Sequence, residues 1–232
     1  MKTGYKILLV NIILFMAIFF TMDRALGYFL RHFYQTTRSG AIHHLNYSLD
    51  STYADVIILG SGRAHSNYIP GIIEERLDLT CFNTGMDGTY IMNSYAVYKS
   101  LIHRYQPKIF IMDISTLHEL FEGSDPYASL KWLLPYYKDK EELRGILLER
   151  SRYERIKLMN QIYPYNSKLL AIIKGNAKTE DISELKGFQP YHGFLTDTTM
   201  ARSRQEEDRI DIDILSILET MAAECDSLQT KL

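Results

Sequence analysis

The chain opens with a long apolar stretch, which is followed by short apolar segments. Sixteen residues, Ile7 to Met22, contain only two polar side chains. A run of this length is close to the minimum for a helix that crosses a bilayer and is long for the core of a signal peptide. Lys6 precedes the run and Arg24 follows it, so that both cations can reach lipid headgroups. We therefore predict an uncleaved, single-pass membrane anchor with the amino terminus inside and the remaining chain exported.

The segments after the anchor predict alternating strands and helices. Three short apolar runs have the pattern of strands covered on both faces: residues 55–59, 79–82 and 108–114. Apolar residues recur at helical spacing after Pro70 and again over residues 91–105, and Pro107 ends the second helix. The buried stripe of the first helix is predicted to comprise Ile72, Ile73 and Leu77. Such strand–helix–strand units predict parallel strands joined by right-handed crossovers, in a sheet covered by helices.

The polar and mixed composition of residues 35–54 predicts a linker. It would join an anchor and juxtamembrane helix, residues 1–34, to a domain formed by residues 55–232. Residues 205–231 predict a long amphipathic helix at the end of that domain.

Residues 120–200 interrupt the alternation and predict a helical insertion rich in tyrosine. Within it, residues 141–160 predict one amphipathic helix with Arg and Glu side chains outward. Its inward side chains would be Leu143, Leu147, Tyr153 and Ile156. Aromatic residues at helical spacing favour a packed core over a sugar-stacking surface.

The composition is typical of a globular protein and disfavours one class of partner. Hydrophobic residues make up 46% and charged residues 23% of the 232 residues. The formal net charge of -2 does not favour a nucleic-acid surface. Cys81 and Cys225 both lie in apolar segments, so they are either two buried thiols or, in an exported domain, one disulfide.

Ligands of parallel sheets bind beyond the carboxyl ends of the strands. The loops at these ends are residues 60–66, 83–89 and 115–119. The first loop contains Gly60 and Gly62, but His65 stands where a dinucleotide site needs its third glycine, and no acid follows the second strand. A hydroxyl in this loop would lie near a helix amino terminus, where free N–H groups can stabilise an oxyanion.

The segments "DVIILGSGRAHSNYIP", "CFNTGMDGTYI" and "QPKIFIMDI" occur in that order in the chain. Together they resemble membrane-anchored bacterial proteins of the SGNH/GDSL hydrolase superfamily. The resemblance implies a flavodoxin-like, three-layer α/β/α fold and the hydrolysis or transfer of acyl esters, often on carbohydrate. It also implies a cell-envelope location, no cofactor, and a backbone N–H of Gly88 as an oxyanion donor.

The chain departs from the family pattern at the reacting groups. The nucleophilic serine of the family falls on Gly62, and its third-loop asparagine falls near Leu117. The chain ends before the Asp-x-x-His motif and the last two strands of the family. A serine without a positioned base is a poor nucleophile at neutral pH. We therefore expect impaired esterase activity, with Ser61 or Ser66 as the only substitutes, or else a non-catalytic carbohydrate-binding or scaffold protein, or a truncated fragment.

Other polar residues of the loops are candidate ligand-binding groups. They are Arg63, His65, Asn83, Asp87 and Asp113. For His65 we expect a solvent-facing side chain, and for Ser66 a helix N-cap. Arg63 either binds a ligand or pairs with Asp87 to fix the two loops.

Two further expectations follow from the order of residues. Adjacent histidines point in different directions, so His43 and His44 do not predict a metal site. Strand 108–114 would be an apolar sheet edge unless the insertion or a partner covers it, because no strand follows the last helix. The part outside the membrane, residues 40–232, would then tend to associate.

Overall fold

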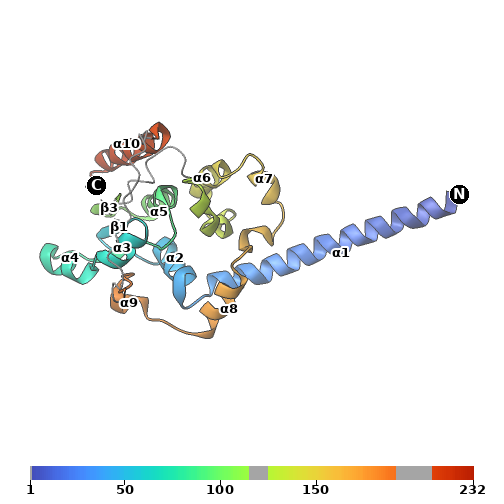
Figure 1. Ribbon diagram of the computed structural model, residues 1–232, viewed down its shortest axis with the longest axis horizontal. Coiled ribbons are helices and arrows are strands. Elements are labelled where there is room, and N and C mark those ends of the chain that lie inside the picture. The colour runs from blue at the N-terminus through green and yellow to red at the C-terminus, as the bar shows by residue number, and fades with distance from the viewer. Residues whose placement is uncertain (1, 115–124, 192–210) are drawn as a thin grey trace, which may run out of the picture.

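The computed structural model describes residues 2–114, 125–191 and 211–232. Three strands form a parallel sheet in the order β2–β1–β3, with β1 at Val56–Leu59, β2 at Cys81–Asn83 and β3 at Ile109–Met112 (Figure 1). Val56 is in register with Cys81 on one side and with Ile109 on the other. The predicted mixed α/β class with parallel strands is confirmed.

Helices pack against both faces of the sheet. Ile57, Phe82 and Phe110 face the main core, which includes apolar residues of α2 (Gly40–Asp50), α5 (Ile91–Arg104) and α10 (Ile212–Ser227). Val56 and Ile58 face a smaller cluster formed with α3 (Gly62–Asn67) and α4 (Pro70–Leu77). The predicted stripe of α4 is wrong in part, because Ile73 packs in this cluster whereas Ile72 and Leu77 are exposed. The four strand residues of β1 are fully buried, which explains the unbroken apolar run.

The predicted linker at residues 35–54 is wrong, because residues 40–50 form helix α2 in the main core. Ile42, Leu45 and Leu49 are buried at the spacing of one helix face. The polar residues between them, among them His43 and Asn46, concealed this stripe in the sequence.

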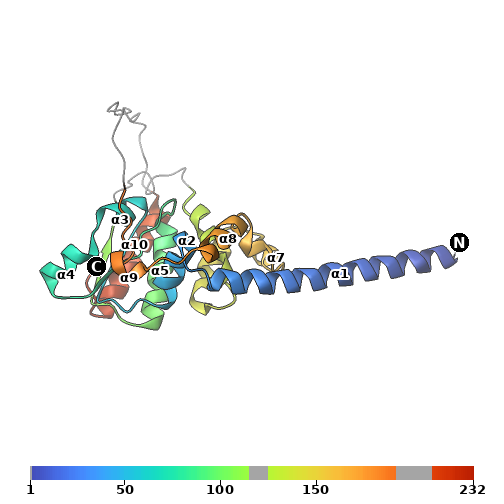
Figure 2. The ribbon, with the colours of Figure 1, turned by 90° about the horizontal axis from the view of Figure 1, so that it is seen from below.

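One continuous helix, α1 (Lys2–Gln35), contains both the predicted anchor and the predicted juxtamembrane segment. It is long and apolar enough to cross a membrane, and residues 4–22 have no contact that buries them. Figures 1 and 2 show this part projecting alone from the folded domain. From Asp23 onward the helix packs against the domain, and Tyr34 is buried with its ring edge-to-face against Tyr136 and Tyr165.

The insertion consists of short helices and turns. Its helices are α6 (Arg144–Glu149), α7 (Glu154–Lys157), α8 (Leu169–Ala177) and α9 (Ile182–Leu185). Its 3-10 turns lie at Ala128–Trp132, Leu134–Tyr136, Glu141–Leu143 and Tyr163–Tyr165. Tyr136 and Tyr165 of the insertion belong to the main core, which agrees with the expectation that its aromatic residues form packed core.

The single helix predicted for residues 141–160 is wrong. Ser151 interrupts it, since its hydroxyl accepts the N–H of Tyr153 and its carbonyl accepts the N–H of Glu154. Leu143 and Leu147 are buried as predicted, but Tyr153 and Ile156 are exposed and Glu154 is fully buried, so the predicted orientation is wrong for the second half of the segment.

The segment after α10 pairs with the outer edge of β3 through a single β-bridge. Ile109 forms a parallel bridge with Lys231, and Phe110 donates its N–H to the Lys231 carbonyl at 2.7 Å. Cys81 and Cys225 are buried free thiols, so the disulfide alternative is not realised. Residues 205–210 of the predicted last helix and residues 120–124 and 192–200 of the insertion lie outside the described residues.

Candidate functional site

The loops that follow β1 and β2 lie side by side at the carboxyl edge of the sheet. Met86 donates its N–H to the Gly60 carbonyl at 3.3 Å. Gly60 has a positive φ of 150°, and a Cβ at this position would lie 2.7 Å from the Cβ of Ala64 and 3.0 Å from that of Asp113. A glycine is therefore required where the chain leaves β1 and passes beside the end of β3.

Asn83 joins these two loops through its buried side chain. Its amide donates to the carbonyls of Ala64 at 2.7 Å and Tyr68 at 3.0 Å, and its Oδ1 accepts the N–H of Gly85 at 2.9 Å. The Ala64 carbonyl also accepts the N–H of Tyr68 at 3.4 Å, and Tyr68 directly follows α3, so Asn83 binds the end of that helix. Its side-chain polar atoms are thus engaged within the protein, and Asn83 acts as a positioning residue.

Asp87 lies where a side chain at Gly62 would project. A Cβ on Gly62 would be 2.7 Å from Asp87 Oδ1, the same oxygen that lies 3.3 Å from His65 Nδ1. His65 therefore contacts Asp87 between the two loops, a role for which the sequence offered Arg63 as one of two alternatives. His65 exposes only 15% of its side chain, so the prediction of a solvent-facing histidine is wrong.

His44 of α2 packs behind His65. Its ring lies 5.2 Å from the His65 ring and is stacked on Phe82. Its Nε2 lies 2.8 Å from the Asn83 carbonyl oxygen, which can only accept, so Nε2 carries the proton. Burial, and then the charge of nearby His65, lower the pKa of His44 to about 4. His44 is consequently neutral near pH 7, and its Nδ1 is an acceptor that has no partner among the described residues.

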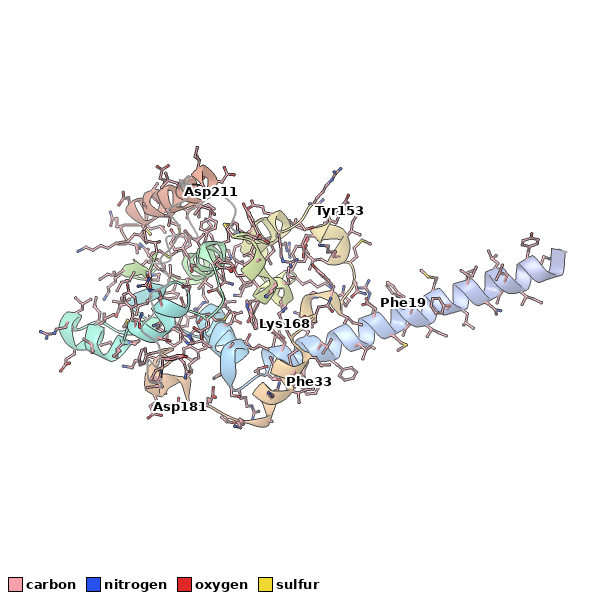
Figure 3. All side chains as sticks on the ribbon, in the orientation of Figure 1. Phe19, Phe33, Tyr153, Lys168, Asp181 and Asp211 are labelled. Carbon is pink, nitrogen blue, oxygen red and sulfur yellow. The ribbon has the colours of Figure 1, made fainter. Side chains whose placement is uncertain are left out.

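A cavity of about 430 Å³ lies beside these histidines. Its wall includes His44, His65, Asp87, Asp181, Phe188 and Gln189. Asp181, labelled in Figure 3, begins α9 and uses its carboxylate to cap that helix through the N–H of Ser183. Glu180 and Glu184 also line the cavity, so carboxylates surround the neutral His44 on its wall.

The segment 186–189 closes one side of the site. Asn83 donates its N–H to the Lys186 carbonyl at 2.9 Å, and Gln189 donates its N–H to the His65 carbonyl at 3.0 Å. Gly187 has a φ of +83°, and a Cβ there would lie 2.0 Å from the Asn83 oxygen. The sequence indicated only a loop at this point, although its glycine was the available signal for a close approach.

The other predicted site residues are not among the residues that line the described wall of the cavity. Ser61 is the N-cap residue of α3, and Gly88 is exposed with a φ of +68° and open space around it. Ser66 lies inside α3, so the prediction that it caps the next helix is wrong; Ile69 has that place. Arg63 is exposed, Asp113 is buried beside Gly60, and Leu117 with its whole loop, residues 115–119, lies outside the described residues.

Within the described parts of the chain, no group of three or more His, Cys, Asp or Glu side chains has an arrangement that could hold a metal ion. No family model matches the chain, and neither a curated protein nor a solved structure matches it. The resemblance to SGNH hydrolases therefore stays a prediction.

Proposed function

We propose that the protein is a membrane-anchored, exported binding protein whose flavodoxin-like, three-layer domain resembles an SGNH hydrolase without its nucleophile. In this proposal α1 spans the membrane and the cavity holds a hydroxyl-rich ligand of the carbohydrate class. The observation that carries the non-catalytic part is the carboxylate of Asp87. It lies 2.7 Å from the position of a Gly62 Cβ, where the resemblance requires a serine side chain.

Hydrogen-bonding groups of the wall support a ligand that offers hydroxyl donors. The neutral His44 contributes a buried acceptor at Nδ1, and Asp87 contributes a carboxylate that is 73% exposed. A hydroxyl that reaches His44 would remove the cost of leaving this buried acceptor without a partner. Phe188 adds an apolar surface to the wall, and pockets that combine apolar area with a few fixed polar groups are typical of small-ligand sites.

Titration calorimetry on the full-length protein in detergent tests this proposal. Two neutral oligosaccharides, chitotetraose and cellotetraose, are each titrated into the wild type and into D87N. We expect binding of at least one sugar that D87N weakens about tenfold or more, and no turnover of 4-nitrophenyl acetate. D78N is the matched control, because Asp78 is an exposed residue on the far end of α4. Failure of both sugars to bind would contradict the proposal.

Ester hydrolysis by Ser61 is the second candidate, and the His65–Asp87 contact favours it. His65 donates its N–H to the Ser61 carbonyl at 3.0 Å, so the two residues are one helical turn apart and share a face. A histidine oriented by a carboxylate is the base that a serine nucleophile needs. Turnover of 4-nitrophenyl acetate that S61A abolishes and S66A leaves intact would establish this candidate in place of the first.

A further inference from the structure

The segment around α7 buries one carboxylate and exposes three large apolar side chains. The buried carboxylate of Glu154 accepts hydrogen bonds from Arg150 and Lys157, each at 3.2 Å, and from the Tyr163 hydroxyl at 2.5 Å. With Glu154 fixed inward, Tyr153, Ile156 and Met159 are more than half exposed. We call these three residues, with the exposed Arg152 and Arg155, the α7 patch.

Two polar residues of α1 hold this segment against the helix. The carboxylate of Asp23 accepts the N–H groups of Gln161 and Ile162, and the guanidinium of Arg24 donates to the Met159 carbonyl at 3.2 Å. These are the first residues of α1 after its exposed apolar stretch ends at Met22. Figure 3 shows Tyr153 at the end of the domain from which α1 leaves, with Phe19 farther out along the helix.

If residues 4–22 cross the hydrocarbon layer, their length determines how far the α7 patch lies from the bilayer centre. At 1.5 Å per residue, residues 4–22 extend roughly 28 Å, close to the hydrocarbon thickness of about 30 Å. Arg24 then lies at the headgroup level, and Met159, which is bound to it, lies at the same level. Exposed Tyr28 and Phe29 follow on α1, where aromatic side chains favour the membrane interface.

The charge of the segment complements anionic headgroups. Residues 150–160 contain Arg150, Arg152, Arg155 and Lys157 against Glu154 as the one carboxylate. Exposed apolar side chains between exposed arginines are typical of segments that lie in a membrane interface. Nearby, Arg24, Arg31 and Lys138 line a small cavity at the base of α1, with Asp139 paired to Arg31. Burial, and then the charges of Arg24 and Arg31, lower the pKa of Lys138.

We infer that the α7 patch inserts into the headgroup region of an anionic bilayer beside α1. This inference rests on the proposed role of α1 as a membrane span. The patch would give the domain a second contact with the lipid, in addition to the helix, and so fix the side of the domain that faces the membrane.

Depth-dependent fluorescence quenching on the full-length protein tests the inference. Single cysteines at Ile156, Ile72 and Phe15 carry a polarity-sensitive fluorophore, and the protein is placed in nanodiscs of phosphatidylglycerol with spin-labelled lipids. Ile72 is the matched control, because it is exposed to a similar degree (54% against 65% for Ile156) but lies on α4 at the end of the domain opposite α1. Protein without an introduced cysteine is the background control, because it measures how much fluorophore reacts with the two buried native thiols.

We expect I156C to be quenched at least threefold more strongly than I72C. Reversal of the patch charges, R152E with R155E, should halve this quenching at position 156, whereas R76E on α4 should leave it unchanged. Equal quenching at positions 156 and 72, or equal quenching of I156C in phosphatidylcholine and phosphatidylglycerol, would overturn the inference. The F15C protein separates the two failures, since loss of its quenching contradicts the membrane span itself.

Discussion

The turns at the carboxyl edge of the sheet and the junction between α1 and the insertion are built in different ways. The edge is formed by residues 60–66 and 83–89 through glycines and main-chain hydrogen bonds. The junction contains two buried carboxylates: Asp23 accepts from Gln161 and Ile162, which lie far along the chain, and Glu154 accepts from Arg150 and Lys157 of its own segment. The glycines of the two edge loops are visible in the sequence, whereas the partners of Asp23 lie 138 and 139 positions away from it and no motif marks them. Four predictions test this contrast.

Glu154→Ala should have the largest effect on stability. Removal of this carboxylate leaves Arg150 and Lys157 without the buried partner at which they converge, and we expect a loss of about 3–5 kcal/mol in the free energy of unfolding. Urea unfolding of the full-length protein in detergent measures it. Glu141→Ala is the control, since Glu141 is 86% exposed and its pair with Arg144 should contribute at most about 0.5 kcal/mol. Similar losses for both variants would contradict the central role of Glu154.

His44 should make stability depend on pH. Its pKa is lowered from 6.5 in the unfolded chain to about 4 in the folded protein, so the unfolded state binds more protons between these values. The contribution is complete above pH 6.5 and is lost as the pH falls toward 4, by about 3 kcal/mol in total. Unfolding measured from pH 4 to 7 should show this slope for the wild type. H44Q should lack it and H43Q should retain it; an unchanged slope in H44Q would assign the titration to another group.

Two glycines of the edge should respond differently to a methyl group. In G85A the new Cβ would lie 2.6 Å from the main-chain nitrogen of His65, which cannot move freely. We expect a loss of about 2 kcal/mol. In G62A the Cβ meets the carboxylate of Asp87, which is exposed and can turn away, so the expected loss is below about 1 kcal/mol. Thermal unfolding ranks the two variants, and the reverse order would contradict the described packing.

Tyr34→Phe should have a smaller effect than G85A. The Tyr34 hydroxyl donates to the Trp132 carbonyl at 3.0 Å within the junction, and its removal should cost about 1 kcal/mol. Tyr28→Phe on the exposed side of α1 should change the free energy of unfolding by less than the error of the measurement. A Tyr34→Phe protein as stable as the wild type would show that the ring alone, and not its hydrogen bond, anchors the helix.

Sequence patterns were sufficient for the elements whose environment is uniform. The fully buried β1 and the long exposed stretch of α1 each show one unbroken apolar run, and both were predicted. Patterns failed where a polar residue is buried or an apolar residue is exposed, as at His44 in α2 and Ile156 in α7. Residues 141–160 have a helical period, but Ser151 competes for the main chain there and Glu154 finds its partners inside.

The same limit applies to the candidate site. The two loops were identified from their glycines, and a contact between them was one of two alternatives, with Arg63 in place of His65. The cavity also needs His44 from a predicted linker and Gln189 from a segment more than a hundred residues away from the first loop. No local signal links these segments, because their proximity is a product of the tertiary packing.

Because α1 is one continuous helix, the orientation of the domain depends on the number of residues between the exposed stretch and the core. Tyr34 is packed in the core, and the helix continues without interruption back to Met22. The domain therefore cannot rotate independently of the exposed part of α1. One residue inserted after Met22 would raise the cavity by about 1.5 Å and turn it by about 100° around the helix axis. In the proposed arrangement, with α1 across a membrane, a neighbouring membrane protein would therefore approach the mouth of the cavity from one side only.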